Sequence, residues 1–245
     1  MLKFLRQTWS IALMTIIPVL RVKSFFLQLP ILAILPLYFI LMFGGDRSSI
    51  LHALAGGIVT SSTFLGLGLM QDFVYEKHYY KLVDMLVASP LPPLAYVLGK
   101  LLGSLLLSLP SSAPLMLLLA HIVGYQRIVI ISFLALMLLG TLMGCISFTM
   151  ATLMATVKEV GALPSLLGVV LLYLPPVYYP CESLPLFIRG VAKAIPTVTA
   201  AEIIKHYSWI SRVSQQGILL RWIYLTCVTL ALAVLSIKIS RWREP

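Results

Sequence analysis

Charged residues are scarce in this chain. Only 11% of its 245 residues are Asp, Glu, Lys or Arg, whereas 60% are hydrophobic. A soluble domain usually has about 25% charged residues, so the deficit excludes a surface that mostly faces water. The apolar residues form runs of about 20 or more, and a transmembrane barrel would instead show alternating strands of roughly 10 residues. We therefore predict an all-α integral membrane protein, because helices satisfy their own backbone hydrogen bonds in lipid.

Motifs for catalysis and metal binding are also missing. The chain has no G-x-x-x-x-G-K-[ST] phosphate loop, no H-E-x-x-H and no G-x-S-x-G. Its four histidines are scattered, it has no paired carboxylate site, and no pair among its three cysteines has metal-ligand spacing. We assign no catalytic residue and no metal site. An intramembrane enzyme is disfavoured, because it needs catalytic residues at membrane depth.

The charge that is present is mostly basic, with a net value of +10. In a soluble protein this would suggest nucleic acid, but there is no basic stripe with interleaved aromatics. We instead expect Lys and Arg to flank spans and face anionic lipid. Of the 18 Lys and Arg residues, ten fall on the side with both termini and six on the other, which predicts cytoplasmic termini. Lys100 and Arg221 lie inside span ends and are expected to snorkel to the nearer surface.

Six spans are predicted from the apolar runs, each of about 20 residues or more, the length that a helix needs to cross a bilayer. They cover residues 24–43, 51–71, 94–123, 128–155, 162–179 and 217–239. Residues 1–23 precede the first span, and Lys3, Arg6, Gln7 and Ser10 would lie on one side of a helix there. Most of its remaining surface is apolar, so we predict an amphipathic helix in the membrane interface.

Residues 75–90, after the second span, begin with charges and continue with an amphipathic pattern. Leu82, Met85 and Leu86 recur at helical spacing, and Pro90 would end the helix. Two interpretations stay open. The segment is either a short helix across the cytoplasmic end of a span, which a partner can push as a rigid body, or a solvated loop.

Residues 180–216, before the last span, are too polar and too broken to cross the membrane. Residues 184–191 show one apolar helical side, which Pro196 would end, and Thr199 to Glu202 form a capping-box pattern that would start a second helix. Two short helices dipping into the outer leaflet would form a re-entrant lid over a central path. The alternative is an ordinary extracellular loop.

Weakly polar residues occur inside the spans. Seven are candidates for lining a translocation path: Thr60, Ser61, Ser104, Ser108, Ser111, Tyr178 and Tyr179. The three serines of residues 104–111 share one helix face. Small and hydroxyl residues, including the GxxxG of Gly140 and Gly144, also favour close helix packing, so both interpretations stay open. No acidic residue falls clearly at mid-membrane, which disfavours a proton or cation relay.

Two stretches resemble the permeases of type-2 ABC exporters. The first contains Glu76-Lys77 and Ala88-Ser89-Pro90, and the second contains Tyr179-Pro180, Leu184-Pro185 and Pro196-Thr197. The resemblance implies that residues 75–90 form the coupling helix that contacts an ATPase. The residues implied in that contact are Glu76, Lys77, Leu82, Asp84, Met85, Leu86, Ser89 and Pro90, with Lys158 and Glu159 as a second, smaller contact. Many family members carry Gly-Thr where this chain has Tyr79-Tyr80-Lys81.

The resemblance also implies an assembly. Residues 1–245 would be one permease domain, paired with a second copy or a paralogous permease and with two copies of a separate ATPase that binds ATP and Mg. It would lie in the cytoplasmic membrane of a prokaryote and export a hydrophobic or amphipathic cargo of drug, lipid or glycolipid type by alternating access. The alternative is a secondary transporter or channel without an ATPase. Such proteins often show intramembrane charges and internal repeats, and we find neither in the sequence.

Overall fold

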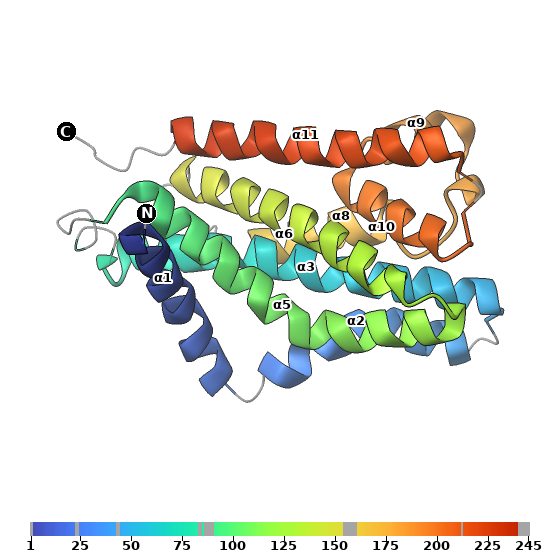
Figure 1. Ribbon diagram of the computed structural model, residues 1–245, viewed down its shortest axis with the longest axis horizontal. Coiled ribbons are helices and arrows are strands. Elements are labelled where there is room, and N and C mark those ends of the chain that lie inside the picture. Colours follow the sequence, from blue (N-terminus) through green and yellow to red (C-terminus); the bar gives the residue numbers. More distant parts are fainter. Residues whose placement is uncertain are drawn as a thin grey trace.

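The computed structural model describes residues 2–22, 25–42, 45–82, 85, 91–153, 161–211 and 213–239, and every regular element within these ranges is helical (Figure 1). The elements are α1 (Leu2–Arg21), α2 (Phe25–Met42), α3 (Arg47–His78), α5 (Pro93–Val123), α6 (Arg127–Leu153), α8 (Leu163–Tyr173), η1 (Cys181–Ser183), α9 (Leu186–Lys193), α10 (Pro196–Tyr207) and α11 (Gln215–Ile239).

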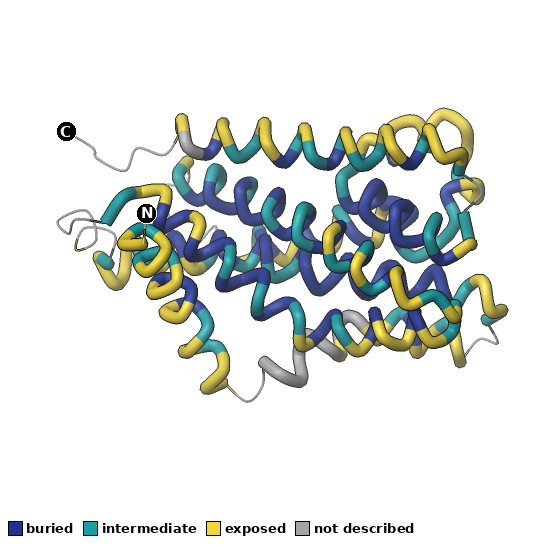
Figure 2. Tube along the Cα trace, in the orientation of Figure 1, coloured by how far each residue is buried: buried dark blue, intermediate teal, exposed yellow. Residues whose placement is uncertain are grey.

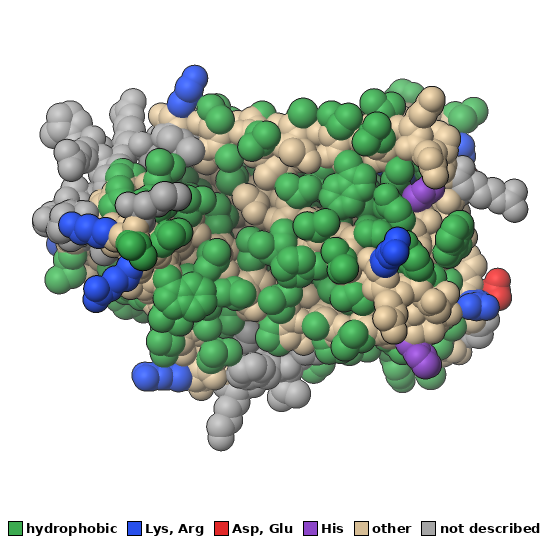
Figure 3. All heavy atoms as spheres, in the orientation of Figure 1, with side chains coloured by type: hydrophobic (Ala, Val, Ile, Leu, Met, Phe, Trp, Pro, Cys, Tyr) green, Lys and Arg blue, Asp and Glu red, His purple; other side chains and the backbone are tan. Residues whose placement is uncertain are grey.

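Four helices in the described ranges are long and apolar enough to cross a membrane: α3, α5, α6 and the Gln215–Ser236 part of α11. The first predicted span corresponds to α2, with 18 residues. The fifth predicted span, residues 162–179, is not confirmed, because α8 has only 11 residues and a crossing helix needs about 20. Figure 3 shows hydrophobic side chains across most of one face of the molecule, with Lys and Arg mostly near its ends. These features confirm the prediction of an all-α membrane protein.

Helix α3 lies at the centre of the bundle. It packs against α2, α5, α6, α8 and α10, and Figure 2 shows it buried over most of its length. Glycines on α6 allow the close approach of a neighbouring helix: a Cβ added to Gly140 would lie 2.5 Å from Leu105 Cδ2, and one added to Gly144 would lie 2.1 Å from Leu101 Cδ2. The GxxxG pattern therefore serves helix packing, as one of the two interpretations predicted.

Helix α1 crosses α5 at an angle to the long axis of the bundle (Figure 1). Its buried residues Ile11, Ala12 and Thr15 lie on α5, where Gly99 and Gly103 leave no room for a side chain. Large apolar residues on the rest of α1, including Leu2, Leu5 and Trp9, are exposed. This exposed apolar surface is what a helix in the membrane interface needs, and that location stays a prediction.

The two ends of the bundle hold different segments (Figure 1). One end carries the start of α1, the end of α3, the start of α5 and the end of α11. The opposite end carries α9 and the start of α11. The first and last helices therefore have their chain ends on the same side of the bundle, as an even number of crossings requires.

Two predicted boundaries differ from the structure. Helix α3 continues to His78 instead of ending at residue 71, because nothing in that sequence breaks a helix before the left-handed Lys81, whose φ is 48°. The predicted capping box from Thr199 is wrong. Helix α10 begins with Pro196 as its first residue, a position where the missing N–H of proline costs nothing.

Candidate functional site

The predicted ATPase contact is only partly described. Glu76 and Lys77 form part of the last turns of α3. Leu82 is half-buried, and Met85 is 71% exposed, with its backbone N–H donating to the Lys81 carbonyl at 3.3 Å. The remaining predicted contacts lie outside the described residues: Asp84, Leu86, Ser89, Pro90, Lys158 and Glu159. The coupling assignment therefore stays a prediction, with Met85 as its most exposed described residue.

Glu76 joins the end of α3 to α5. Its carboxylate forms an ion pair with Lys100 and accepts a hydrogen bond from the Tyr96 hydroxyl at 2.6 Å. Lys100 is 2% exposed, so the prediction that it snorkels to the surface was wrong. A buried ammonium is costly unless a carboxylate neutralises it. Glu76, on the neighbouring helix α3, supplies that carboxylate. Glu76 therefore holds two helices together, whatever it also contributes to a partner.

Most of the hydroxyl groups on the predicted path bond to their own helices. Ser61, Ser108 and Ser111 are buried and donate to backbone carbonyls three residues earlier, at 2.7–2.9 Å. Ser104 does the same to Leu101 at 2.9 Å, but it also lines the groove described below. Ser104 therefore lies beside an open space, whereas the other serines are buried between packed helices.

Thr60 and Tyr178 meet on the side of α3 that faces the loop after α8. Thr60 donates to the Gly56 carbonyl at 2.8 Å, and its oxygen is hydrogen-bonded to the Tyr178 hydroxyl. The Tyr178 ring stacks on Tyr173 with centroids 5.6 Å apart. A side chain at Gly56 would collide with this ring, since its Cβ would lie 2.4 Å from Tyr178 Cδ1. These contacts hold the loop after α8 against α3.

Tyr179 is tied to Lys205 of α10 through its backbone. The buried Lys205 amine donates to the carbonyls of Pro176 and Tyr179, both at 3.0 Å. Burial lowers the pKa of Lys205 to about 8, although Glu202 raises it in part. The Tyr179 hydroxyl donates to the Leu174 carbonyl at 2.9 Å. Lys205 therefore organises the non-helical backbone after α8, which needs partners away from water.

A second ion pair joins α10 to α11, between Glu202 and Arg221. Glu202 is 6% exposed, so this carboxylate is not the capping residue that the sequence predicted. Arg221 was expected to snorkel to the nearer surface; its side chain is 17% exposed and paired with Glu202, so that expectation stays a prediction. Sequence reasoning missed both Lys205 and this pair, because partners on two different helices share no local pattern. The available signal was the presence of charged residues on a short polar stretch and on the span that follows it.

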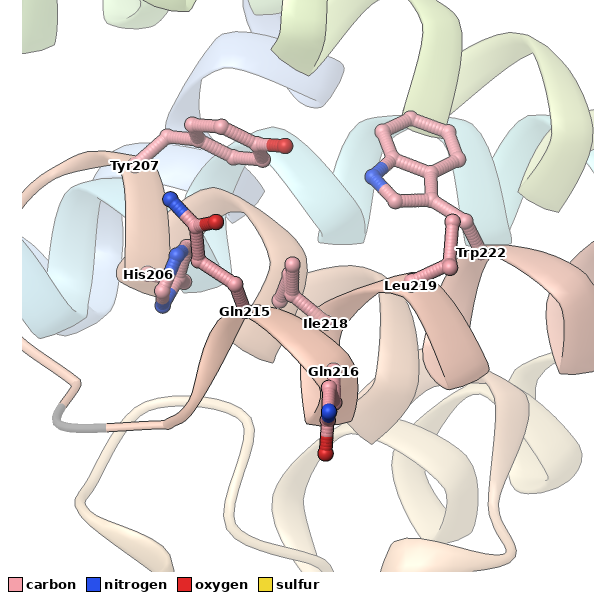
Figure 4. Close-up of a pocket in the computed structure, with 7 residues that line it drawn as sticks. All are labelled: His206, Tyr207, Gln215, Gln216, Ile218, Leu219 and Trp222. Carbon is pink, nitrogen blue, oxygen red and sulfur yellow. The ribbon is translucent and has the colours of Figure 1, made fainter.

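A pocket of about 490 Å³ lies between the end of α10 and the start of α11. It is lined by His206, Tyr207, Gln215, Gln216, Ile218, Leu219 and Trp222. Figure 4 shows the rings of Tyr207 and Trp222 on the same side of the α11 start, while Gln216 points the opposite way. Aromatic residues with a polar end are common where helices leave a bilayer.

A groove of about 520 Å³ lies along the sides of the spans. Its walls come from four helices: Thr15 and Val19 of α1; Phe64, Leu65, Gly68, Leu69, Gln71 and Asp72 of α3; Ser104 and Leu107 of α5; and Pro164, Ser165 and Val169 of α8. Pockets for drug-sized molecules measure about 300–1,000 Å³. The groove is therefore large enough for an amphipathic molecule, and Ser104 is the predicted path residue that contacts it.

A bundle of long apolar helices is typical of a multi-pass membrane protein. The family model for the ABC-2 type transporter matches residues 5–207. The chain belongs to this family and is the permease component of an ABC-type transporter, which pairs with an ABC ATPase subunit. No curated protein matches the chain.

Proposed function

We propose that this permease exports a hydrophobic or amphipathic molecule, of drug, lipid or glycolipid type, out of the cytoplasm of a prokaryote. The observation that carries the proposal is the groove between α1, α3, α5 and α8. Its size suits such a cargo, and its walls combine aliphatic and aromatic side chains with the weakly polar Ser104 and Ser165. Without a phosphate loop of its own, the chain takes its energy from the partner subunit.

The assembly we propose contains two permeases and two ATPase subunits. The second permease is another copy of this chain or a paralogue, and the ATPases bind ATP and Mg. ATP binding would close the ATPases and push residues 75–90 of each permease. The Glu76–Lys100 pair supports this transmission, because it fixes the end of α3 to α5. A push on that end would move α3 and α5 as one rigid body against α1 and α8, and this motion would open the groove to each side of the membrane in turn, as alternating access requires.

Reconstitution tests the proposal. The tagged chain is purified with the ATPase that accompanies it, placed in liposomes, and assayed for ATP-driven movement of lipophilic fluorescent molecules away from the side that holds the ATPase. We expect movement by the complex and none by the chain alone. An ATPase whose phosphate-loop lysine is replaced is the matched control, because it assembles without hydrolysis.

The alternative is a secondary transporter or channel. It would move cargo with the chain alone, driven by an ion gradient and indifferent to ATP. Gradient-driven transport by the isolated chain would contradict our proposal, and so would ATP hydrolysis by a preparation free of other subunits.

A further inference from the structure

Asp72, near the end of α3, lies where two hollows meet. It lines the groove of about 520 Å³ and also a second pocket of about 400 Å³ between α1, the end of α3 and α5. Thr15 and Val19 of α1 line both hollows as well. The two spaces therefore share a boundary, and the only acidic residue in the described ranges that lines both is Asp72.

The carboxylate of Asp72 is not neutralised by a close partner. Within the ranges that the structure describes, it forms no hydrogen bond and no ion pair. Lys100 and Glu76 act on it only at longer range and with opposite signs, and they are already paired with each other. Asp72 is exposed at the edge of the groove, so its unpaired negative charge is open to an arriving cation, which it attracts.

The rest of the groove offers apolar surface and free space. Phe64, Leu65 and Leu69 of α3 and Val169 of α8 line it. Gly68 lies on the same face of α3 as Asp72, one helical turn away, and a Cβ added there would meet no atom within 4 Å. Elsewhere on α3, Gly56 and Gly66 are packed tightly against other residues. Gly68 therefore keeps the groove open and does not serve helix packing.

We propose that this site selects amphipathic cations, holding the apolar body of the molecule in the groove beside Gly68 and its positive group at Asp72. The inference rests on the proposed function and adds the charge of the cargo. A lipophilic cation matches both features, whereas a lipophilic anion of the same shape would meet the unpaired carboxylate. A neutral lipid or a second copy of the chain would fill the groove without using Asp72.

Binding of two probes of nearly equal shape and opposite charge tests the site. Tetraphenylphosphonium and tetraphenylborate are titrated onto the chain in phosphatidylcholine nanodiscs, with empty nanodiscs subtracted. We expect saturable binding of the cation only. Asp72→Asn should weaken it about tenfold or more, the effect of losing one charge pair in a partly exposed site. Asp46→Asn, the same change at the opposite end of α3, should bind as wild type, since Asn also caps helices.

A second pair of variants tests the location. Gly68→Phe should abolish cation binding by filling the groove. Gly190→Phe, on the exposed helix α9, also meets open space and should bind as wild type. The proposal is overturned if Asp72→Asn binds the cation as tightly as wild type, if both probes bind equally, or if Gly68→Phe leaves binding unchanged. It is also overturned if wild type binds neither probe, and disruption of a dimer by Gly68→Phe would then show that a second copy covers the groove.

These measurements use neither ATP nor an ATPase. A failure of charge-selective binding with ATP-driven transport intact would reject the cation site and leave the exporter proposal standing. Cation binding without any ATP-driven transport would reject the exporter proposal and support the site.

Discussion

A single buried amine, that of Lys205, links the stability of the α8–α10 region to pH. Its pKa in the folded chain is about 8, lowered by burial, and an unfolded Lys titrates near 10.4. Between these values the unfolded chain binds more protons, so stability must rise with pH. Below about pH 8 the folded chain bears the full cost of burying the charged amine. As the pH rises to about 10, that cost is relieved, which amounts to on the order of 2 kcal/mol.

Replacing Lys205 by Met tests this directly. Unfolding in mixed micelles with SDS, followed at pH 7 and pH 10, should show wild type gaining stability relative to Lys205→Met as the pH rises. Cys181, Glu182, Glu202 and Arg221 also act on Lys205, but they are present in both proteins. The exposed Lys193 gives the control, because Lys193→Met should track wild type at both pH values. A stability difference between wild type and Lys205→Met that stays constant with pH would show that the amine is not buried as described.

Helix α3 shows which structural features the sequence predicts and which it does not. Its apolar run predicted a span, and the structure confirms a membrane-length helix. Its last turns carry charges, which the sequence pattern placed after the span, in either a separate short helix or a solvated loop. In the structure these turns continue α3, and Glu76 in them is partnered by Tyr96 and Lys100, which lie 20 and 24 positions later. Pairing between helices leaves no local signal, so the sequence predicted the four helices in the described ranges that are long enough to cross a membrane and missed Asp72, Lys205 and the two ion pairs.

The segment after α3 is the predicted contact with the ATPase, and its exposed Met85 allows that contact to be tested. Met85 is 71% exposed, and burying a Met side chain in a partner contributes about 1.5–3 kcal/mol. Met85→Asp should therefore weaken capture of the ATPase about tenfold or more, measured by pull-down from membranes at several ATPase concentrations. Leu186 on α9 is 82% exposed at the opposite end of the bundle, and Leu186→Asp should capture the ATPase as wild type does. Equal capture by all three proteins would remove Met85 from the contact.

The two ends of the molecule hold different structural features. The end with the start of α1 and the end of α11 also holds Glu76, Lys100 and Asp72, beside the segment predicted to meet the ATPase. The other end holds α9, η1 and the carbonyls bound by Lys205, which close the bundle. Between them lies the groove, reached at Asp72 from the first end. This arrangement suits a permease that is pushed at one end and releases its cargo toward the other.

The different character of the two ends predicts how the chain is oriented in the membrane. The bias of Lys and Arg toward the side with the termini places that side in the cytoplasm and the α9–α10 end outside. In a chain whose three native cysteines are replaced by Ala, Ser211→Cys lies in the loop after α10, and Tyr80→Cys lies at the opposite end, where Tyr80 is 70% exposed. A membrane-impermeant maleimide should label Ser211→Cys in intact cells and Tyr80→Cys only after lysis. The reverse pattern would invert the topology, and it would place Asp72 and the predicted ATPase contact on the side of the membrane that has no ATP.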